Sequence, residues 1–370
     1  MRGCVGERHG VTCCWNRLSS SDWRAVRAQV APGAAATLRV RLDPAQLTGR
    51  YDGYVVAYTN DPVAAEITLS SNLRLCATMI SDLRAAAPNS SSTKERLFPS
   101  ASLIKVPIMA AVFEKIRAGQ LSLDTQIKLN RGYRVGGSGS LKWVRDGTSL
   151  SVMEIVYKMI TESDNTATDL FLEAIGGPAA VTGWLREIGI EDLRVDRSTV
   201  ELLRDYAGTP APEPGESYSA QYRRLLAEGK LAAFALDGAS EGYIAFEQDP
   251  RDQGTPAAMS RLLAGLWRGE LLSSAGIELL RGAMLRCRTG ENRLRGRLPE
   301  GTVVAHKSGT ITGTVNDVGV IALPGDRGRL VISVYVKNAV GDRASHERAI
   351  AEIARVAYDY FALNDFGSDD

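Results

Sequence analysis

Apolar residues recur every three to four positions along much of the later part of the chain, which is the spacing of one face of an α-helix. The clearest such pattern covers residues 102–119, where Ile104, Ile108, Val112 and Ile116 fall on one face. The same kind of spacing predicts further helices at 150–160, 165–175, 257–268, 276–287 and 345–361. We therefore expect a helix-rich body from residue 102 onwards.

Runs of β-branched and other apolar residues predict strands near both ends of the chain. Toward the C-terminus these runs lie at 302–306, 316–323 and 329–337. Toward the N-terminus they lie at 37–43, 54–59 and 67–69, with Pro, Gly and Asn turn signals between them. The segment 73–86 fits a helix and a strand equally well.

The order of these elements predicts the fold class and the domains. Helices followed by antiparallel strands indicate an α+β or three-layer α/β/α domain, expected at residues 72–370, after a small β-sandwich-like domain at 1–71. Residues 206–253, rich in Pro, Gly, Glu and Tyr, indicate an insertion with a short helix near 220–228. Its tyrosines either form a lid over a site or pack on the surface; they are Tyr206, Tyr218, Tyr222 and Tyr243.

Composition and charge narrow the classes of function. The chain has 370 residues, of which 44% are hydrophobic and 24% charged, as in ordinary globular proteins. Its 44 Lys and Arg balance 43 Asp and Glu, so we expect no nucleic-acid partner. No apolar run reaches the ~18 residues of a membrane span, and no secretory signal is visible after Met1.

Cysteine and histidine positions bear on metal and hydrolytic chemistry. The five cysteines are an odd number, and Cys4, Cys13 and Cys14 with His9 do not have the spacing of a zinc site. We therefore expect no metal and no other cofactor. The sequence has three histidines, and His306 directly precedes a strand lysine, which disfavours a Ser-His-Asp hydrolase.

Ser102 and Lys105 form a Ser-X-X-Lys sequence at the start of the expected helix. A three-residue spacing places both side chains on one helix face, and the helix start directs backbone amides toward developing negative charge. A lysine whose pKa falls through burial or a neighbouring cation can take the proton of a serine hydroxyl. Alone, the pair also fits a capping serine beside a solvated lysine.

Two further motifs follow this pair along the chain. Ser163-Asp164-Asn165 by itself suits a helix cap, and Lys307-Ser308-Gly309 by itself suits the end of an edge strand. All three motifs in this order, with these flanking residues, are hard to explain by chance.

On these motifs the sequence resembles the serine β-lactamase and penicillin-binding-protein superfamily, and most closely the class A β-lactamases. The similarity extends from about Phe98 to Ala362 and includes the segments 137–141 and 287–294. The resemblance implies an antiparallel sheet flanked by helices, a helical lobe and a site between them. Residues 31–62 also resemble part of an immunoglobulin-like domain of exported bacterial proteins, so we expect a chain that begins inside a longer reading frame and a periplasmic or extracellular location.

The resemblance to class A enzymes also implies roles for individual residues. Ser102 would be the acylated nucleophile, Lys105 would take its proton, and Ser163 would pass a proton to the leaving nitrogen. The backbone amides of Ser102 and Thr310 would form the oxyanion hole. Arg293 is either a carboxylate-binding or a surface arginine. The substrate-binding residues implied are Asn165, Lys307, Ser308, Gly309, Thr310 and Arg293.

One residue of the class A pattern is missing. These enzymes carry a glutamate, on a loop after the second motif, that activates the water of deacylation, but an ungapped alignment puts Thr199 there. A threonine hydroxyl has no accessible pKa with which to act as a general base near neutral pH. Three explanations stay open: a shifted loop brings Glu201 to the water, another group acts, or deacylation is slow.

Three functions remain in competition. The first and preferred one is a monomeric serine hydrolase that acylates on Ser102 and hydrolyses β-lactams. The second is a D-Ala-D-Ala peptidase or transpeptidase, or a related amidase or esterase, acting on a peptidoglycan-like substrate. The third is a β-lactam-binding sensor that keeps the acyl adduct.

Overall fold

The computed structural model describes residues 53–58, 64–69, 74–81, 97–130, 134–207, 249–325, 328–339 and 342–363, with isolated positions between 213 and 246. Its main sheet has six strands in the order β2-β1-β3-β10-β9-β8. β1 and β3 are parallel, and all other neighbours are antiparallel. The strands are β1 (Gly53–Tyr58), β2 (Ala64–Leu69), β3 (Arg74–Ser81), β8 (Val304–Ile311), β9 (Gly313–Ala322) and β10 (Arg329–Ala339).

Helices make up most of the remaining described residues. They are α1 (Lys105–Arg117), α2 (Val152–Thr161), α3 (Asn165–Ile175), α4 (Pro178–Glu187), α5 (Thr199–Ala207), α8 (Pro256–Arg268), α9 (Ser274–Leu285) and α10 (Arg343–Leu363). Two short 3-10 helices are η2 (Ala101–Ile104) and η4 (Leu141–Trp143). Two small ribbons pair β4 (Phe98–Pro99) with β7 (Gln253–Gly254), and β5 (Gln126–Lys128) with β6 (Ser149–Ser151).

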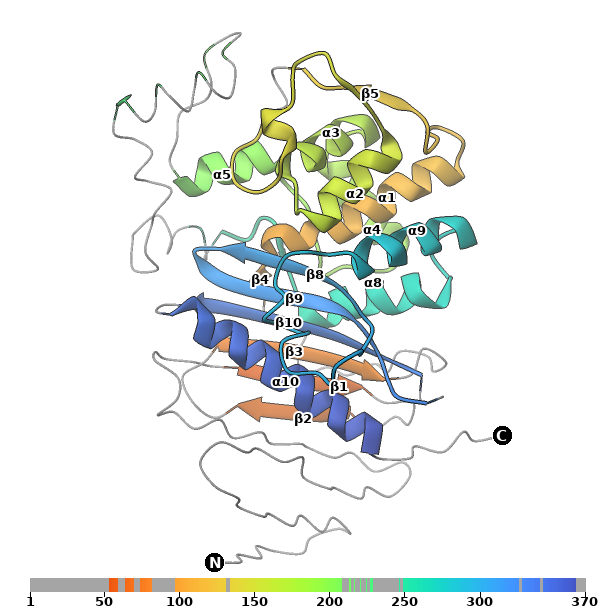
Figure 1. Cartoon of the computed structure of the whole chain (residues 1–370), viewed down its shortest axis with the longest axis vertical. Coiled ribbons are helices and arrows are strands. Elements are labelled where there is room, and N and C mark those ends of the chain that lie inside the picture. Colours follow the sequence, from red (N-terminus) through yellow and green to blue (C-terminus); the bar gives the residue numbers. More distant parts are fainter. Residues whose placement is uncertain are drawn as a thin grey trace, which may run out of the picture.

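The main sheet has a helical layer on each face, as the period-two alternation of β10 requires. Ile332 and Val334 belong to the core under α10, whereas Val331 and Tyr335 belong to the core shared with α1, α8 and α9. Figure 1 shows α10 crossing one face of the sheet, with α1 to α5 grouped into a lobe at one end. The α+β fold in three layers with a helical lobe is therefore confirmed.

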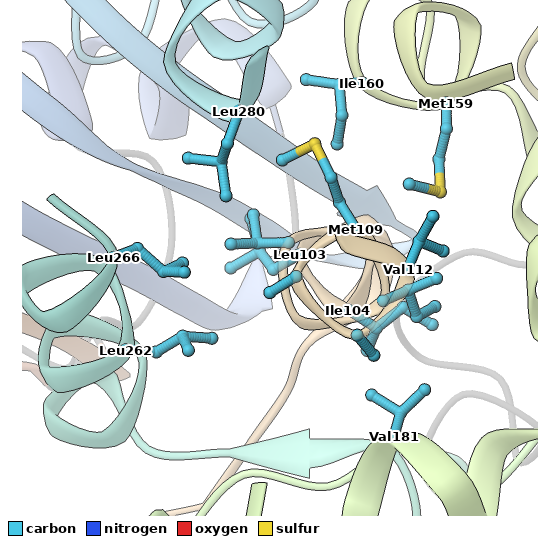
Figure 2. Close-up of a cluster of buried hydrophobic side chains, with 14 of the residues drawn as sticks. Leu103, Ile104, Met109, Val112, Met159, Ile160, Val181, Leu262, Leu266 and Leu280 are labelled. Carbon is cyan, nitrogen blue, oxygen red and sulfur yellow. The ribbon is translucent and has the colours of Figure 1, made fainter. Parts of the chain in front are cut away.

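Helix α1 lies at the centre of the larger core. Its apolar side chains, with those of η2, are surrounded by residues of four other helices (Figure 2). The labelled residues are Leu103, Ile104, Met109 and Val112 of the centre, and Met159, Ile160, Val181, Leu262, Leu266 and Leu280 around it. The burial of the first turns of α1 fixes the position of Lys105 and of η2, which carries Ser102.

Most of the predicted elements are confirmed. The helix at 165–175 has the predicted bounds, and the ambiguous segment 73–86 contains strand β3. The helix expected at 102–119 divides into η2 and α1. Helices α4 and α5 were not predicted; α4 begins at Pro178 directly after two glycines with positive φ.

The N-terminal part differs from the expected separate β domain at residues 1–71. β1 and β2 come from that segment, yet they extend the main sheet beside β3, so the boundary after residue 71 does not separate two sheets. The strand expected at 37–43 and the three N-terminal cysteines lie outside the described residues. Within the expected insertion 206–253, the described positions Ala220, Arg224 and Ala227 are helical, as the sequence predicted. None of the described helices is long and apolar enough to cross a membrane.

Candidate active site

Ser102 and Lys105 stand side by side at the junction of η2 and α1. Lys105 Nζ lies 3.1 Å from Ser102 Oγ. The serine is half-buried, whereas the lysine is buried to 1% exposure. The arrangement predicted from the three-residue spacing is therefore present, and the solvated-lysine alternative is excluded by the burial.

Lys105 is enclosed by oxygen atoms of the second motif. Its Nζ donates to Ser163 O over 2.6 Å and to Asn165 Oδ1 over 2.7 Å, and lies 3.1 Å from Ser163 Oγ. With Ser102 Oγ, four oxygens face an ammonium that has three hydrogens. Burial, followed by the positive charge of Lys307, lowers the pKa of Lys105 well below its usual range. A neutral amine can accept the Ser102 proton.

Ser163 bridges the two lysines of the site. Lys307 Nζ lies 3.0 Å from Ser163 Oγ, on which Lys105 Nζ also converges. Ser163 has φ +56°, a left-handed conformation that costs a non-glycine residue ~1–3 kcal/mol. Burial also lowers the pKa of Lys307. The geometry suits a hydroxyl that passes protons between an amine and a substrate atom.

Asp164 holds the second motif in place. It caps α3 by accepting from Ala167 N over 2.9 Å, and its other oxygen accepts from Leu141 N over 2.8 Å. Gly139 is needed opposite, because a Cβ there would lie 2.2 Å from the Asp164 carboxyl carbon. The capping role predicted for this tripeptide is confirmed for Asp164, which also ties loop 136–141 to the site.

The third motif forms the β8 wall of the site. Gly309 packs on the turn that carries Ser102, since a Cβ there would lie 2.9 Å from Ser100 O. Ser308 Oγ lies 2.6 Å from Thr289 Oγ1. Thr310 follows in an exposed position at the end of the strand. The backbone of β8 thus runs beside Ser102, as an oxyanion hole between Ser102 and Thr310 requires.

Arg293 is fully buried rather than a surface arginine. Its guanidinium donates to Gly309 O over 3.1 Å and to Thr310 Oγ1 over 2.6 Å. Glu347 of α10 holds the same guanidinium at 3.1 Å. Glu347 was not predicted, because it lies 54 residues from Arg293 on another element and no local spacing relates the two. Arg293 brings a fixed positive charge under the Lys-Ser-Gly strand.

The carboxylate of Glu201, a candidate for activating the water, forms part of a helix cap. Its Oε2 accepts from Ser198 N and Ser198 Oγ, both over 2.8 Å, in an exposed cap at the start of α5. Thr199, by contrast, is buried to 7% exposure. Among the described residues, the hydrogen bonds of Glu201 are with Ser198 and not with the other candidate residues.

A buried carboxylate that was not predicted lies next to Thr199. Asp169 accepts from Thr199 N over 2.6 Å and from Val200 N over 2.9 Å. Burial raises its pKa to about 6, although these amides and Lys105 act in the opposite direction. The sequence contained one usable signal, because Asp169 follows Asn165 by four residues in a predicted helix and so shares its face.

One of the four tyrosines of the insertion is described. Tyr206 is buried and packs edge-to-face on Phe246, with ring centroids 5.1 Å apart. Ile311, which directly follows Thr310 on β8, packs against the same small cluster. The other three tyrosines lie outside the described residues.

Comparisons with known proteins agree with this site. The family model described as "Beta-lactamase enzyme family" matches residues 71–361. β-Lactamase VEB-1 of Pseudomonas aeruginosa is 28% identical over 275 residues, which cover 71% of this chain and 78% of the relative. The extended-spectrum β-lactamase PER-1 of the same organism is 28% identical over 272 residues, covering 71% of this chain and 75% of the relative.

Solved structures show the same similarity. The ancestral (GNCA) class A β-lactamase has a TM-score of 0.61 at 32% sequence identity, covering 77% of this chain and 93% of that chain. A β-lactamase from Chitinophaga pinensis has a TM-score of 0.60 at 27% identity, covering 79% and 94%. With the fold, the paired lysines and the family match in agreement, the chain belongs to the β-lactamase enzyme family.

Proposed function

We propose that this protein hydrolyses β-lactams through an acyl-enzyme on Ser102. The observation that carries the proposal is the 3.1 Å contact between Ser102 Oγ and the buried Lys105 Nζ. The lowered pKa of Lys105 lets the neutral amine act as the base that frees the nucleophile. The match to class A β-lactamases supports the substrate class.

Acylation follows from the order of the contacts. Ser102 Oγ attacks the lactam carbonyl carbon while Lys105 takes its proton. Ser163 Oγ then delivers a proton to the lactam nitrogen as the ring opens, and it recovers a proton from the lysine side, where both amines lie within 3.1 Å of it. Amides of Ser102 and Thr310 would stabilise the oxyanion, at about 3–4 kcal/mol per donor.

Substrate binding depends on the positive wall of the site. Lys307 and the buried Arg293 lie along β8, where an anionic group can bind beside Ser308 and Thr310. Penicillins and cephalosporins carry such a carboxylate next to the reacting amide. Asn165 would bind the side-chain amide of the substrate; its Nδ2 donates to Gly136 O in the structure. We further propose that the protein acts outside the cytoplasm, as its resemblance to exported proteins implies.

A second candidate function has its own support. Glu201 is engaged in a cap and Thr199 replaces the expected glutamate, so an enzyme with slow deacylation would act as a β-lactam-inhibited D-Ala-D-Ala peptidase or as a sensor. The two functions differ in how long the adduct on Ser102 lasts.

An intact-mass time course with a penicillin and a chromogenic cephalosporin tests the proposal. We expect the mass of the β-lactam to add to the protein and then to disappear as product accumulates. The variant Ser102→Ala should add no mass, while the control Ser122→Ala, at an exposed site, should behave as the wild type. No adduct on the wild type would refute acylation, and a permanent adduct would favour the peptidase or the sensor.

A further inference from the structure

We propose that Asp169 is the carboxylate that takes the proton of the hydrolytic water when the acyl-enzyme on Ser102 is cleaved. The inference rests on the proposed β-lactam hydrolysis. It names the general base of deacylation, a role that the Thr199 hydroxyl cannot fill near neutral pH. Asp169 would contact the reacting water directly, so its role is catalytic.

The position of Asp169 on α3 places it one helical turn from the residue that holds Lys105. Asn165 begins α3 and holds Lys105 Nζ at 2.7 Å through its Oδ1. Asp169 comes four residues later, one turn or ~5.4 Å further along the same helix face. α1 packs against α3, and the contact of Asn165 with Lys105 places the start of α3 beside the start of α1. The charge of Lys105 acts on Asp169 accordingly.

The start of α5 fixes the carboxylate on its other side. Thr199 N donates to one oxygen over 2.6 Å, and Val200 N donates to the other over 2.9 Å. Asp169 is thereby bound to the residue that occupies the expected position of the glutamate. The Thr199 side chain also stabilises the carboxylate. The two oxygens offer about four acceptor sites, so these donors leave one for a water molecule.

Other carboxylates in the described part of the chain are less suited to the task. Asp164 also acts electrostatically on Lys105, but its two oxygens cap α3 and hold loop 136–141. Glu162 accepts from Ser140 Oγ and Lys158 Nζ. Glu201 is turned to Ser198.

The surroundings of Asp169 bring its pKa into the range of a general base. Lys105 on α1 is the charged group that acts on it, and the amides at the start of α5 face it from the other side. Asp164 and Lys307 act on the same lysine. A pKa of about 6 leaves the carboxylate ionised at neutral pH, yet more basic than an ordinary aspartate.

The step balances without any further reagent. The water oxygen forms a bond to the acyl carbonyl carbon while one water proton passes to an Asp169 oxygen. The tetrahedral intermediate collapses, the bond between the carbon and Ser102 Oγ breaks, and the proton held by Asp169 passes through Lys105 to Ser102 Oγ. The carboxylic acid product leaves and ionises in solvent, so that Asp169, Lys105 and Ser102 all return to their starting states.

Asp169→Asn tests the proposal, because the amide is isosteric and can still accept a hydrogen bond from α5. Acylation and deacylation are measured separately, by stopped-flow and by intact mass after rapid removal of free β-lactam. We expect deacylation to slow by about 10²–10⁴-fold, with acylation changed by less than about tenfold. The control Asp124→Asn removes an exposed carboxylate and should leave both rates unchanged.

Two further measurements separate chemistry from a structural role. The wild-type deacylation rate should rise with pH through about 6, and this inflection should vanish in Asp169→Asn. Adding Thr199→Glu to Asp169→Asn should restore deacylation at least tenfold by supplying a carboxylate from α5. Equal losses of acylation and deacylation with a lower melting temperature, or an unchanged pH inflection, would overturn the proposal. A wild-type adduct that never hydrolyses would overturn it too, while leaving acylation of Ser102 established.

Discussion

Arg197 and Asp252 lie 55 residues apart in the sequence, yet Arg197 Nε donates to Asp252 Oδ2 over 2.5 Å in a buried ion pair. Asp252 Oδ1 also accepts from the backbone amides of Asp196 and Arg197. The pair therefore joins the two ends of the segment that contains the insertion. Arg197 lies just before α5, and Asp252 lies near the end of the insertion. The entropic cost of joining the two ends of a loop grows only slowly with the length of the loop, so a long insertion is tolerated between them.

Removing one partner of this pair should destabilise the protein. In Asp252→Asn the buried Arg197 guanidinium loses its fully buried partner, and breaking a buried pair costs about 3–5 kcal/mol. We expect the free energy of unfolding to fall by about this amount in urea denaturation. The control Asp205→Asn breaks the contact of Arg197 with a carboxylate that is 43% exposed, and should cost at most about 1 kcal/mol. Equal losses in both variants would contradict the role given to burial.

The ion pair also shows where sequence reasoning stops. Ser102 and Lys105 could be predicted as neighbours because a helix fixes the distance between residues three apart. Arg197 and Asp252 meet only through the tertiary fold, and no local spacing relates them. For the same reason Glu347 could not be found, since it lies 54 residues from Arg293 and meets it only through the tertiary fold.

The helices and strands that carry a strong local repeat of apolar residues could be predicted from the sequence. The helix at 165–175 and the strand β10 have strong repeating patterns, whereas α5 is a short helix that depends on Asp169 for its first amides. Strand pairing was not predictable, and β1 and β2 joined the main sheet against expectation. The expected role of Glu201 was overridden by helix capping. Its carboxylate accepts from Ser198 in a Ser-X-X-Glu capping box.

Lys105→Met should abolish the activation of Ser102 while keeping the shape of the buried side chain. We expect the acylation rate to fall by about 10²–10⁴-fold, the usual contribution of a positioned base. In the wild type this rate should rise with pH as Lys105 loses its proton, at a pH well below the usual lysine range. Stopped-flow acylation across pH measures both effects. The exposed control Lys128→Met should match the wild type, and a Lys105 variant with normal acylation would exclude the lysine as base.

Arg293→Ala should weaken recognition of the substrate carboxylate. The guanidinium positions Thr310 and contributes charge under β8, and a hydrogen bond to a charged group contributes about 1.5–3 kcal/mol. We expect kcat/KM for a β-lactam carboxylate to fall about 10–100-fold. A methyl ester of the same β-lactam should lose much less, since it has no carboxylate to bind. The matched control is Arg297→Ala, an arginine that is 48% exposed. A similar loss for acid and ester would show that Arg293 acts on the fold alone.

His306 and Asp317 should make stability depend on pH. His306 Nδ1 lies 3.0 Å from both Asp317 oxygens, with both side chains fully buried. Burial alone would lower the pKa of His306, but the Asp317 charge outweighs it, and the net pKa is raised. A histidine with a raised folded pKa binds more protons when folded, so its contribution is complete below the unfolded value of about 6.5 and is lost as pH rises through the folded value.

The variant His306→Gln isolates this contribution. We expect the difference in unfolding free energy between wild type and variant to be constant in acid and to shrink as the pH rises above about 6.5. Taking the difference cancels the other groups that titrate in both proteins, including His346, whose pKa is lowered by burial. Urea denaturation at a series of pH values measures it. A difference that grows with pH would mean that His306 is neutral in the folded protein and that Asp317 holds it as a hydrogen-bond acceptor only.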